Sequence, residues 1–258
     1  AFAASIEKDA VSIGVTRKQR PPRNKPSCAP AANSVRSIDL DIKALILGME
    51  NNDNNSDNNN NNGLLGRMME HAGKEHIIHH SFSLAAPVTD RQRLSNTKLS
   101  FNKYSGVQDW NNAIFLWVNL NTGDSPNEFL EGGRQITWFG GSRMRDDSPV
   151  IVKLVKFGKE GRMVTKKDDE GGGDGTSDSG TSDCVSSNIV LWCRRHQPEI
   201  KKFTPYVCFG RLGYRSHVIG SNPLSFVWDL LDYDGLKCHG DLAVRENFEL
   251  FSKCEKMV

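Results

Sequence analysis

The chain has 258 residues, and its 33 lysines and arginines nearly balance 31 aspartates and glutamates, giving a net charge of +2. This balance excludes attraction to nucleic acid or to a membrane surface through a global electrostatic field, so any basic patch must be local. No apolar run approaches the roughly 20 residues that cross a bilayer, and we expect no membrane contact.

Residues 1–101 lack sustained apolar periodicity, and the asparagine tract at 51–62, "NNDNNSDNNNNN", offers no apolar side chain to bury. We predict that this region is mostly disordered, with a basic start. The run "RKQRPPRNKP" at 17–26 is typical of a nuclear import address, a nonspecific phosphate binder or a solvated tail. The segment "SIDLDIKALILGME" at 37–50 has the apolar stripe of a short helix and is a candidate partner-binding segment.

A folded domain is predicted at 102–254, because all five tryptophans lie there and aromatic side chains supply much of a small core. An acidic, glycine- and serine-rich stretch at 166–187 is predicted to be a disordered insertion in this domain. Runs of β-branched and aromatic residues predict strands at 112–120, 134–140, 188–195, 204–214 and 223–232.

Two helices are expected in the same domain. The first begins at Ser148 and Pro149, which suit a helix N-terminus, and is predicted to end at Gly158. The second covers 241–254, where apolar residues recur at near-helical spacing. Strands without regular βαβ alternation predict an α+β fold: a mostly antiparallel, partly closed, small β-barrel-like sheet with two or three helices, preceded by the disordered N-terminal region.

Signatures of catalysis are missing from the sequence. It contains no GxxxxGK[ST], no GxGxxG after a strand, no GxSxG and no HExxH. The aspartates near 146 and 232 are explained by a helix N-terminus and a turn. An enzyme stays open, but we favour a protein without catalytic activity and expect no cofactor.

Histidines and cysteines give little indication of a metal site. His71, His76, His79 and His80 form a cluster that could bind a metal adventitiously, but its flanks look unfolded. Cys193 shares a strand face with apolar neighbours and is interpreted as a core residue. The six cysteines have no CxxC pairs, which favours reduced thiols and an intracellular, potentially nuclear, location. We expect no metal.

Several sequence segments follow one another in an order and spacing that match a known domain. They are "ITWFGGSRMRDDSP", "IVLWCRR" and, at 204–232, "TPYVCFGRLGYRSHVIGSNPLSFVWDLLD". Together this part of the chain resembles the uncharacterised C-terminal domain associated with bacterial superfamily-two (DEAD/DEAH-type) helicases and restriction-linked proteins. The resemblance covers roughly 130–233, interrupted by the acidic insertion, and the helicase motor motifs are absent. It implies association with nucleic-acid processing and no catalytic residue. The matching residues are Pro205, Tyr206, Phe209, Gly210, Tyr214, Ser216, His217, Pro223 and Trp228.

Two segments, 134–145 and 204–217, share one pattern: an aromatic strand enters a glycine-containing turn that carries arginines. Aromatic faces beside guanidinium groups suit stacked bases and phosphates, although the aromatics also fit core positions. The predicted function is a nucleic-acid-binding accessory module that reads DNA or modified bases in a helicase- or restriction-like context, with DNA, RNA and a helicase or other protein as candidate partners. The alternative is a protein-interaction or scaffold domain without nucleic-acid contact. The candidate nucleic-acid-binding residues are Trp138, Arg143, Arg145, Arg211, Tyr214, Arg215 and His217.

Overall fold

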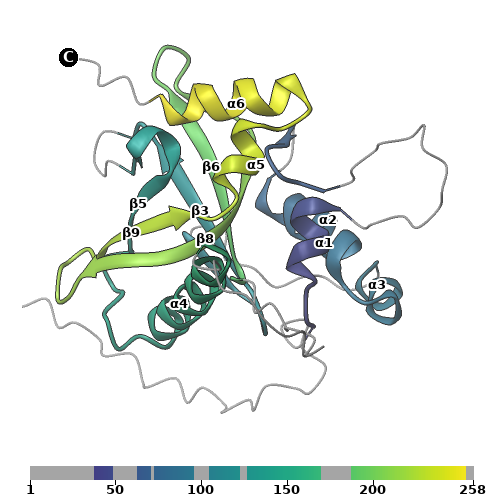
Figure 1. The fold of residues 1–258 in the computed structure, drawn as a ribbon, viewed down its shortest axis with the longest axis horizontal. Helices are drawn as coiled ribbons and strands as arrows, with labels where there is room; N and C mark the ends of the chain where they lie inside the picture. The colour runs from purple at the N-terminus through teal and green to yellow at the C-terminus, as the bar shows by residue number, and fades with distance from the viewer. Residues whose placement is uncertain are drawn as a thin grey trace, which may run out of the picture. The chain divides into compact units, whose positions relative to one another are not determined.

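The computed structural model describes residues 38–48, 63–70, 73–95, 105–122, 127–169 and 187–253, all within one unit, Asn33–Val258. Helices and strands alternate irregularly along these segments, which confirms the α+β class (Figure 1). The helices are α1 (Ile42–Leu47), α2 (Lys74–Ala85), α3 (Val88–Ser95), α4 (Pro149–Asp169), α5 (Tyr233–Lys237) and α6 (Leu242–Ser252), with a short 3-10 helix at Glu131–Gly133. The strands are β1 (Met68–Met69), β2 (Val107–Asp109), β3 (Ile114–Leu120), β4 (Phe129–Leu130), β5 (Gln135–Phe139), β6 (Ile189–Gln197), β7 (Lys202–Phe203), β8 (Tyr206–Val218) and β9 (Ser225–Leu230).

The strands form one mixed sheet in the order β2-β3-β6-β8-β9-β5-β4, with β1 beside β8 and β7 beside β6. Every pair is antiparallel except β3 and β6, which run parallel. The path runs from β2 to β4 without closing in the described segments. The mostly antiparallel sheet is therefore confirmed, whereas partial closure into a barrel stays a prediction.

Strand β8 joins the two halves of this sheet. Its first half pairs with β6 and its second half with β9. The register of the β6–β8 pair shifts between Leu191 and Trp192, and Leu191 pairs with Gly210, whose φ of 83° lies in the region that favours glycine. This irregularity divides β8 into a β6-paired part and a β9-paired part, and the strand extends beyond the predicted end at 214.

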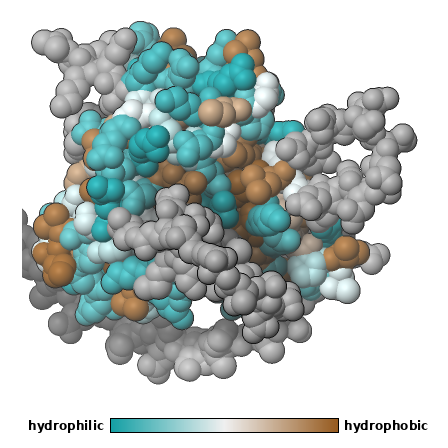
Figure 2. Space-filling model, viewed as in Figure 1, coloured by the Kyte–Doolittle hydropathy of each residue, from teal (hydrophilic) through white to brown (hydrophobic). Residues whose placement is uncertain are grey.

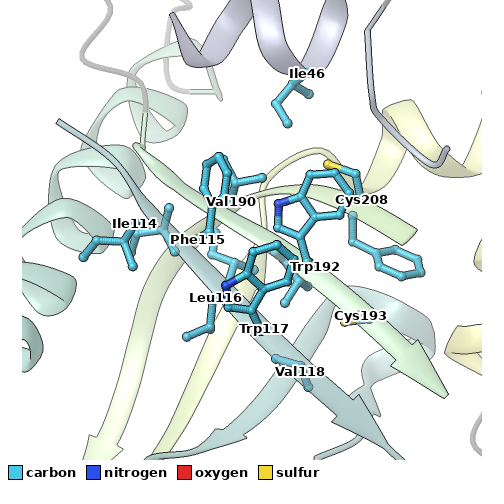
Figure 3. Packing of buried hydrophobic residues seen from close by; sticks show 14 of the residues in the cluster. Ile46, Ile114, Phe115, Leu116, Trp117, Val118, Val190, Trp192, Cys193 and Cys208 are labelled. Carbon is cyan, nitrogen blue, oxygen red and sulfur yellow. The ribbon is translucent and has the colours of Figure 1, made fainter. Parts of the chain in front are cut away.

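Helices α1 and α2 belong to the core. Leu45, Ile46, Ile77, Ile78 and Phe82 are almost fully buried in the same hydrophobic cluster as the sheet. Figure 3 shows Ile46 pointing from its helix toward Trp192 and Cys208 of the sheet. The prediction of a mostly disordered region up to 101 and a domain start at 102 is therefore corrected for segments 38–48, 63–70 and 73–95. Tertiary burial stabilises such short helices, and their own sequence does not show it.

Other parts of the N-terminal prediction lie outside the described residues. These are the basic run at 17–26 and the asparagine tract at 51–62.

Helix α4 does not end at Gly158 as predicted, but continues to Asp169 alongside β8 (Figure 1). A Cβ on Gly158 would lie 2.7 Å from the Trp228 ring and 2.9 Å from Tyr214 Cβ, and one on Gly161 would overlap Ser187. Both glycines therefore permit close approach of helix and sheet, which local sequence rules interpret as a helix stop. Of the predicted disordered insertion at 166–187, residues 166–169 are instead the last residues of α4, and Ser187 is the first residue of the next described segment. Residues 170–186 lie outside the described residues.

Candidate nucleic-acid interface

Arg211 lies in an internal ion pair with Asp232. The Asp232 carboxylate accepts hydrogen bonds from the Arg211 main-chain nitrogen at 2.6 Å and from its terminal amino group at 2.7 Å. Only 24% of the Arg211 side chain and 6% of the Asp232 side chain are exposed. Burial alone would lower the pKa of Arg211, but the hydrogen bonds and charge of Asp232 raise it above its ordinary value. The charge predicted to face a ligand is thus already compensated inside the protein.

Trp138 is a core residue. It is 3% exposed, and its ring centroid lies 5.4 Å from that of Phe226 on the neighbouring strand β9. Because the indole is buried, a base cannot stack on it. The prediction that Trp138 binds nucleic acid is therefore corrected: its side chain packs in the core.

A hydrogen-bond network links three side chains, those of Tyr214, His217 and Asp146. The Tyr214 hydroxyl lies 2.8 Å from Nδ1 of His217, and Nε2 of His217 lies 3.0 Å from Oδ1 of Asp146. An ionised Asp146 only accepts, so Nε2 carries a proton and the tyrosine hydroxyl can donate to Nδ1 of a neutral ring. The second Asp146 oxygen accepts from the Gly220 main-chain nitrogen at 2.9 Å. These hydrogen bonds therefore connect the loop before α4 with the β8–β9 turn.

The remaining predicted arginines have aspartates close by in the sequence or in an ion pair. Arg143 and Arg145 are exposed in the loop that contains Asp146 and Asp147, and Arg215 pairs with Asp229 at 3.0 Å. Three arginines thus share this end of the β8–β9 hairpin with three aspartates. Because phosphate attraction depends on uncompensated positive charge, this end has little electrostatic advantage for nucleic acid.

A second group of basic and aromatic residues, which we name the Lys74–Arg194 cluster, was not identified from the sequence. It consists of Lys74 of α2, Trp117 of β3, Arg194 of β6, Phe203 of β7 and Tyr206 of β8. The strand registers create it, because Trp117 pairs with Trp192, two residues before Arg194, so that the side chains of positions 117, 192 and 194 share one face.

Arg194 is held by neutral groups. Its guanidinium carbon lies 4.1 Å from the Phe203 ring centroid and 4.8 Å from that of Tyr206, and its Nε donates to Asn119 Oδ1 at 2.7 Å. Burial raises the pKa of Tyr206 to about 12 against the lowering effect of Arg194, so this phenol is neutral at physiological pH. Among the described residues, no carboxylate forms an ion pair with Arg194.

Lys74 completes the cluster from the helix side. Its amine donates to the Ser105 carbonyl at 2.8 Å and lies 5.3 Å from the Trp117 ring centroid. Burial, and then the charge of Arg194, lower the pKa of Lys74 to about 8. Two cations therefore lie close enough to repel each other in a half-buried, aromatic environment.

The sequence contained only part of this signal. The ending of "IVLWCRR" places Arg194 at the end of a strand, but nothing local connects it to Lys74, because α2 was assigned to a disordered region.

The described segments offer little for a metal ion or a membrane. They contain no group of three or more histidine, cysteine or acidic side chains placed to hold a metal ion. His76, His79 and His80 lie on α2, and His71 is outside the described residues. Cys193 is fully buried, in agreement with its predicted core position. Among these residues, no helix is both long and apolar enough to cross a membrane.

Comparison of the chain with protein-family models, with curated proteins and with solved structures gives no match. The resemblance to the helicase-associated domain therefore stays a prediction.

Proposed function

We propose that this protein is a nucleic-acid-binding module whose interface is the Lys74–Arg194 cluster. The observation that carries the proposal is the Arg194 guanidinium, which rests on the Phe203 and Tyr206 rings beside Lys74 and has no carboxylate partner among the described residues. The Arg194 guanidinium can contact a phosphate, and the exposed Phe203 ring offers a face for stacking, the two interactions that single-stranded nucleic acids use most.

The local charge supports this choice of surface. Exposed Lys201 and Lys202 lie on the β6–β7 hairpin that also carries Arg194 and Phe203. Together with Lys74 and Arg194 they make four cations, and the exposed carboxylates near them in the described segments are those of Glu70, Glu75 and Glu199. This excess contrasts with the equal numbers of arginines and aspartates at the β8–β9 hairpin end.

The sequence resemblance suggests a context for such a module. A chain without motor motifs would add strand contacts to a helicase- or restriction-like partner that supplies the motor. Strand β8, shared by the two halves of the sheet, favours the partly closed, barrel-like form that small base-reading domains use.

Fluorescence anisotropy with labelled single-stranded DNA, double-stranded DNA and RNA, measured over a range of salt concentrations, tests the proposal on the full chain. Arg194→Ala should weaken binding about tenfold and flatten the salt dependence by roughly one phosphate contact. The matched control is Arg143→Ala, an exposed arginine near carboxylates, which should bind as the parent does. Equal affinities and salt slopes for parent and Arg194→Ala would contradict the proposal.

A protein-interaction function has one specific observation in its favour. Val218 and Ile219, at the end of the β8–β9 hairpin, are 58% and 79% exposed. Figure 2 shows hydrophobic side chains at the left edge, where Figure 1 places the end of this hairpin. If this end binds a protein, replacing both residues with serine should abolish that complex and leave nucleic-acid affinity unchanged.

A further inference from the structure

We propose that the Lys74 amine and the Arg194 guanidinium bind one phosphate group between them, so that the cluster holds a nucleic-acid strand at a defined phosphate. This inference rests on the proposed function and adds a specific subsite to it. The same oxyanion chemistry fits a free phosphate and a phosphodiester, and the experiment below distinguishes the two.

The orientation of Arg194 leaves its terminal amino groups available. Its Nε is bonded to Asn119, and its plane is held over the Phe203 and Tyr206 rings. Within the described segments, these terminal groups donate no hydrogen bond. A guanidinium fixed in this way presents two parallel N–H groups to one anion, which matches the geometry of a phosphate.

Lys74 and Arg194 are like charges placed close enough to repel each other. Arg194 is the charged neighbour that lowers the pKa of Lys74, and burial contributes the larger part of that lowering. Tyr206, which contacts the Trp117 ring beneath Lys74, is neutral and supplies no negative charge. Glu75, the next residue of α2, is exposed. A phosphate between the two cations would replace their repulsion with two attractions.

Lys74 also gives the subsite a pH dependence that an ordinary lysine would not have. With a pKa of about 8, its amine is charged below pH 8 and neutral above it, whereas a solvated lysine stays charged to about pH 10. Phosphate binding stabilises the charged form, so it should raise the pKa of Lys74. Affinity should accordingly be highest well below pH 8 and fall as the pH rises through and above this value. A phosphate monoester does not contribute to this change, because it is already fully ionised there.

The experiment follows the Lys74 amine directly. In the full chain labelled with ¹³C-lysine, the Cε chemical shifts are titrated from pH 6 to 11 alone, with inorganic phosphate, with adenosine monophosphate and with a single-stranded oligonucleotide. Lys74→Arg identifies the signal. We expect Lys74 to titrate near pH 8 alone and about one pH unit higher with a bound ligand. Lys237 also lies over an aromatic ring, that of Tyr233, and its signal should not respond.

Two Arg194 variants separate the subsite from folding effects. Arg194→Met should restore a higher Lys74 pKa and weaken phosphate binding at least tenfold. Arg194→Lys keeps the positive charge but lacks the two parallel N–H groups of the guanidinium. The pKa of Lys74 should therefore stay low, while phosphate should bind more weakly. Thermal melting of each variant shows whether it is folded.

The outcomes are distinguishable. If no ligand moves the Lys74 titration, the subsite is refuted, and anisotropy on the same samples shows whether the oligonucleotide still binds elsewhere on the protein. If inorganic phosphate and adenosine monophosphate shift Lys74 but the oligonucleotide neither shifts it nor binds, the subsite takes free phosphate and the nucleic-acid function is refuted. A shift with the oligonucleotide that Arg194→Met abolishes supports both.

Discussion

Replacing Arg211 with alanine should destabilise the protein strongly, although the sequence suggested a solvated, ligand-facing side chain. The Asp232 carboxylate is almost completely buried, and Arg211 supplies its side-chain hydrogen bonds at 2.7, 3.1 and 3.2 Å. The carboxylate lies so close to the backbone that a Cβ on Gly210 would come within 2.5 Å of it. Removing the guanidinium leaves a buried charge whose remaining hydrogen-bond donor, within the described part of the chain, is the main-chain nitrogen of residue 211. The expected loss is about 3 to 5 kcal/mol, the typical cost of breaking a buried pair.

Urea denaturation of the full chain measures this loss. The matched control is Arg215→Ala, which breaks an exposed pair with Asp229 and should cost less than about 1 kcal/mol. Replacing both partners, Arg211→Met with Asp232→Leu, should recover most of the loss, because no unpaired charge remains. If Arg211→Ala and Arg215→Ala lower the free energy of unfolding equally, the internal pairing of Arg211 does not exist in solution.

Four further changes test the packing. Phe209→Ala should cost about 3 to 5 kcal/mol in urea denaturation, because this fully buried ring packs against three other phenylalanines; a loss below 1 kcal/mol would contradict its core position. Gly158→Val should cost about 1 to 3 kcal/mol or more by overpacking α4 against the sheet, and an unchanged melting temperature would refute the close approach. Deleting residues 1–101 should abolish cooperative thermal unfolding, since α1 and α2 are core elements; a sharp transition in the shortened chain would show otherwise. Asp146→Asn should cost about 1 kcal/mol and speed amide exchange at Gly220, and unaltered exchange would exclude the fastening role.

The sequence by itself determined most of the strands. Runs of β-branched and aromatic residues between turn residues located β3, β5, β6, β8 and β9 to within a few residues, because these preferences act over neighbouring positions. The same local rules identified the start of α4 at Pro149 and the position of α6. They also correctly favoured a mostly antiparallel α+β arrangement.

Local rules were wrong where a distant contact determines the structure. Gly158 looks like a helix stop, yet it permits the approach of α4 to Trp228. The segment containing α1 looks too short for a stable helix, yet the sheet buries it. In both cases the stabilising partner lies far along the chain, so no window of sequence contains the information.

The candidate site shows the same division. The sequence predicted a binding site made of arginines beside aromatics, but only the tertiary structure decided which arginines are paired with carboxylates inside the protein. It compensates Arg211 with Asp232, 21 positions away, and it places Lys74 of a helix beside Arg194 of a strand. Composition and local pattern determine which charges a chain carries, whereas burial and pairing determine which remain uncompensated, and those depend on contacts that only the folded chain makes.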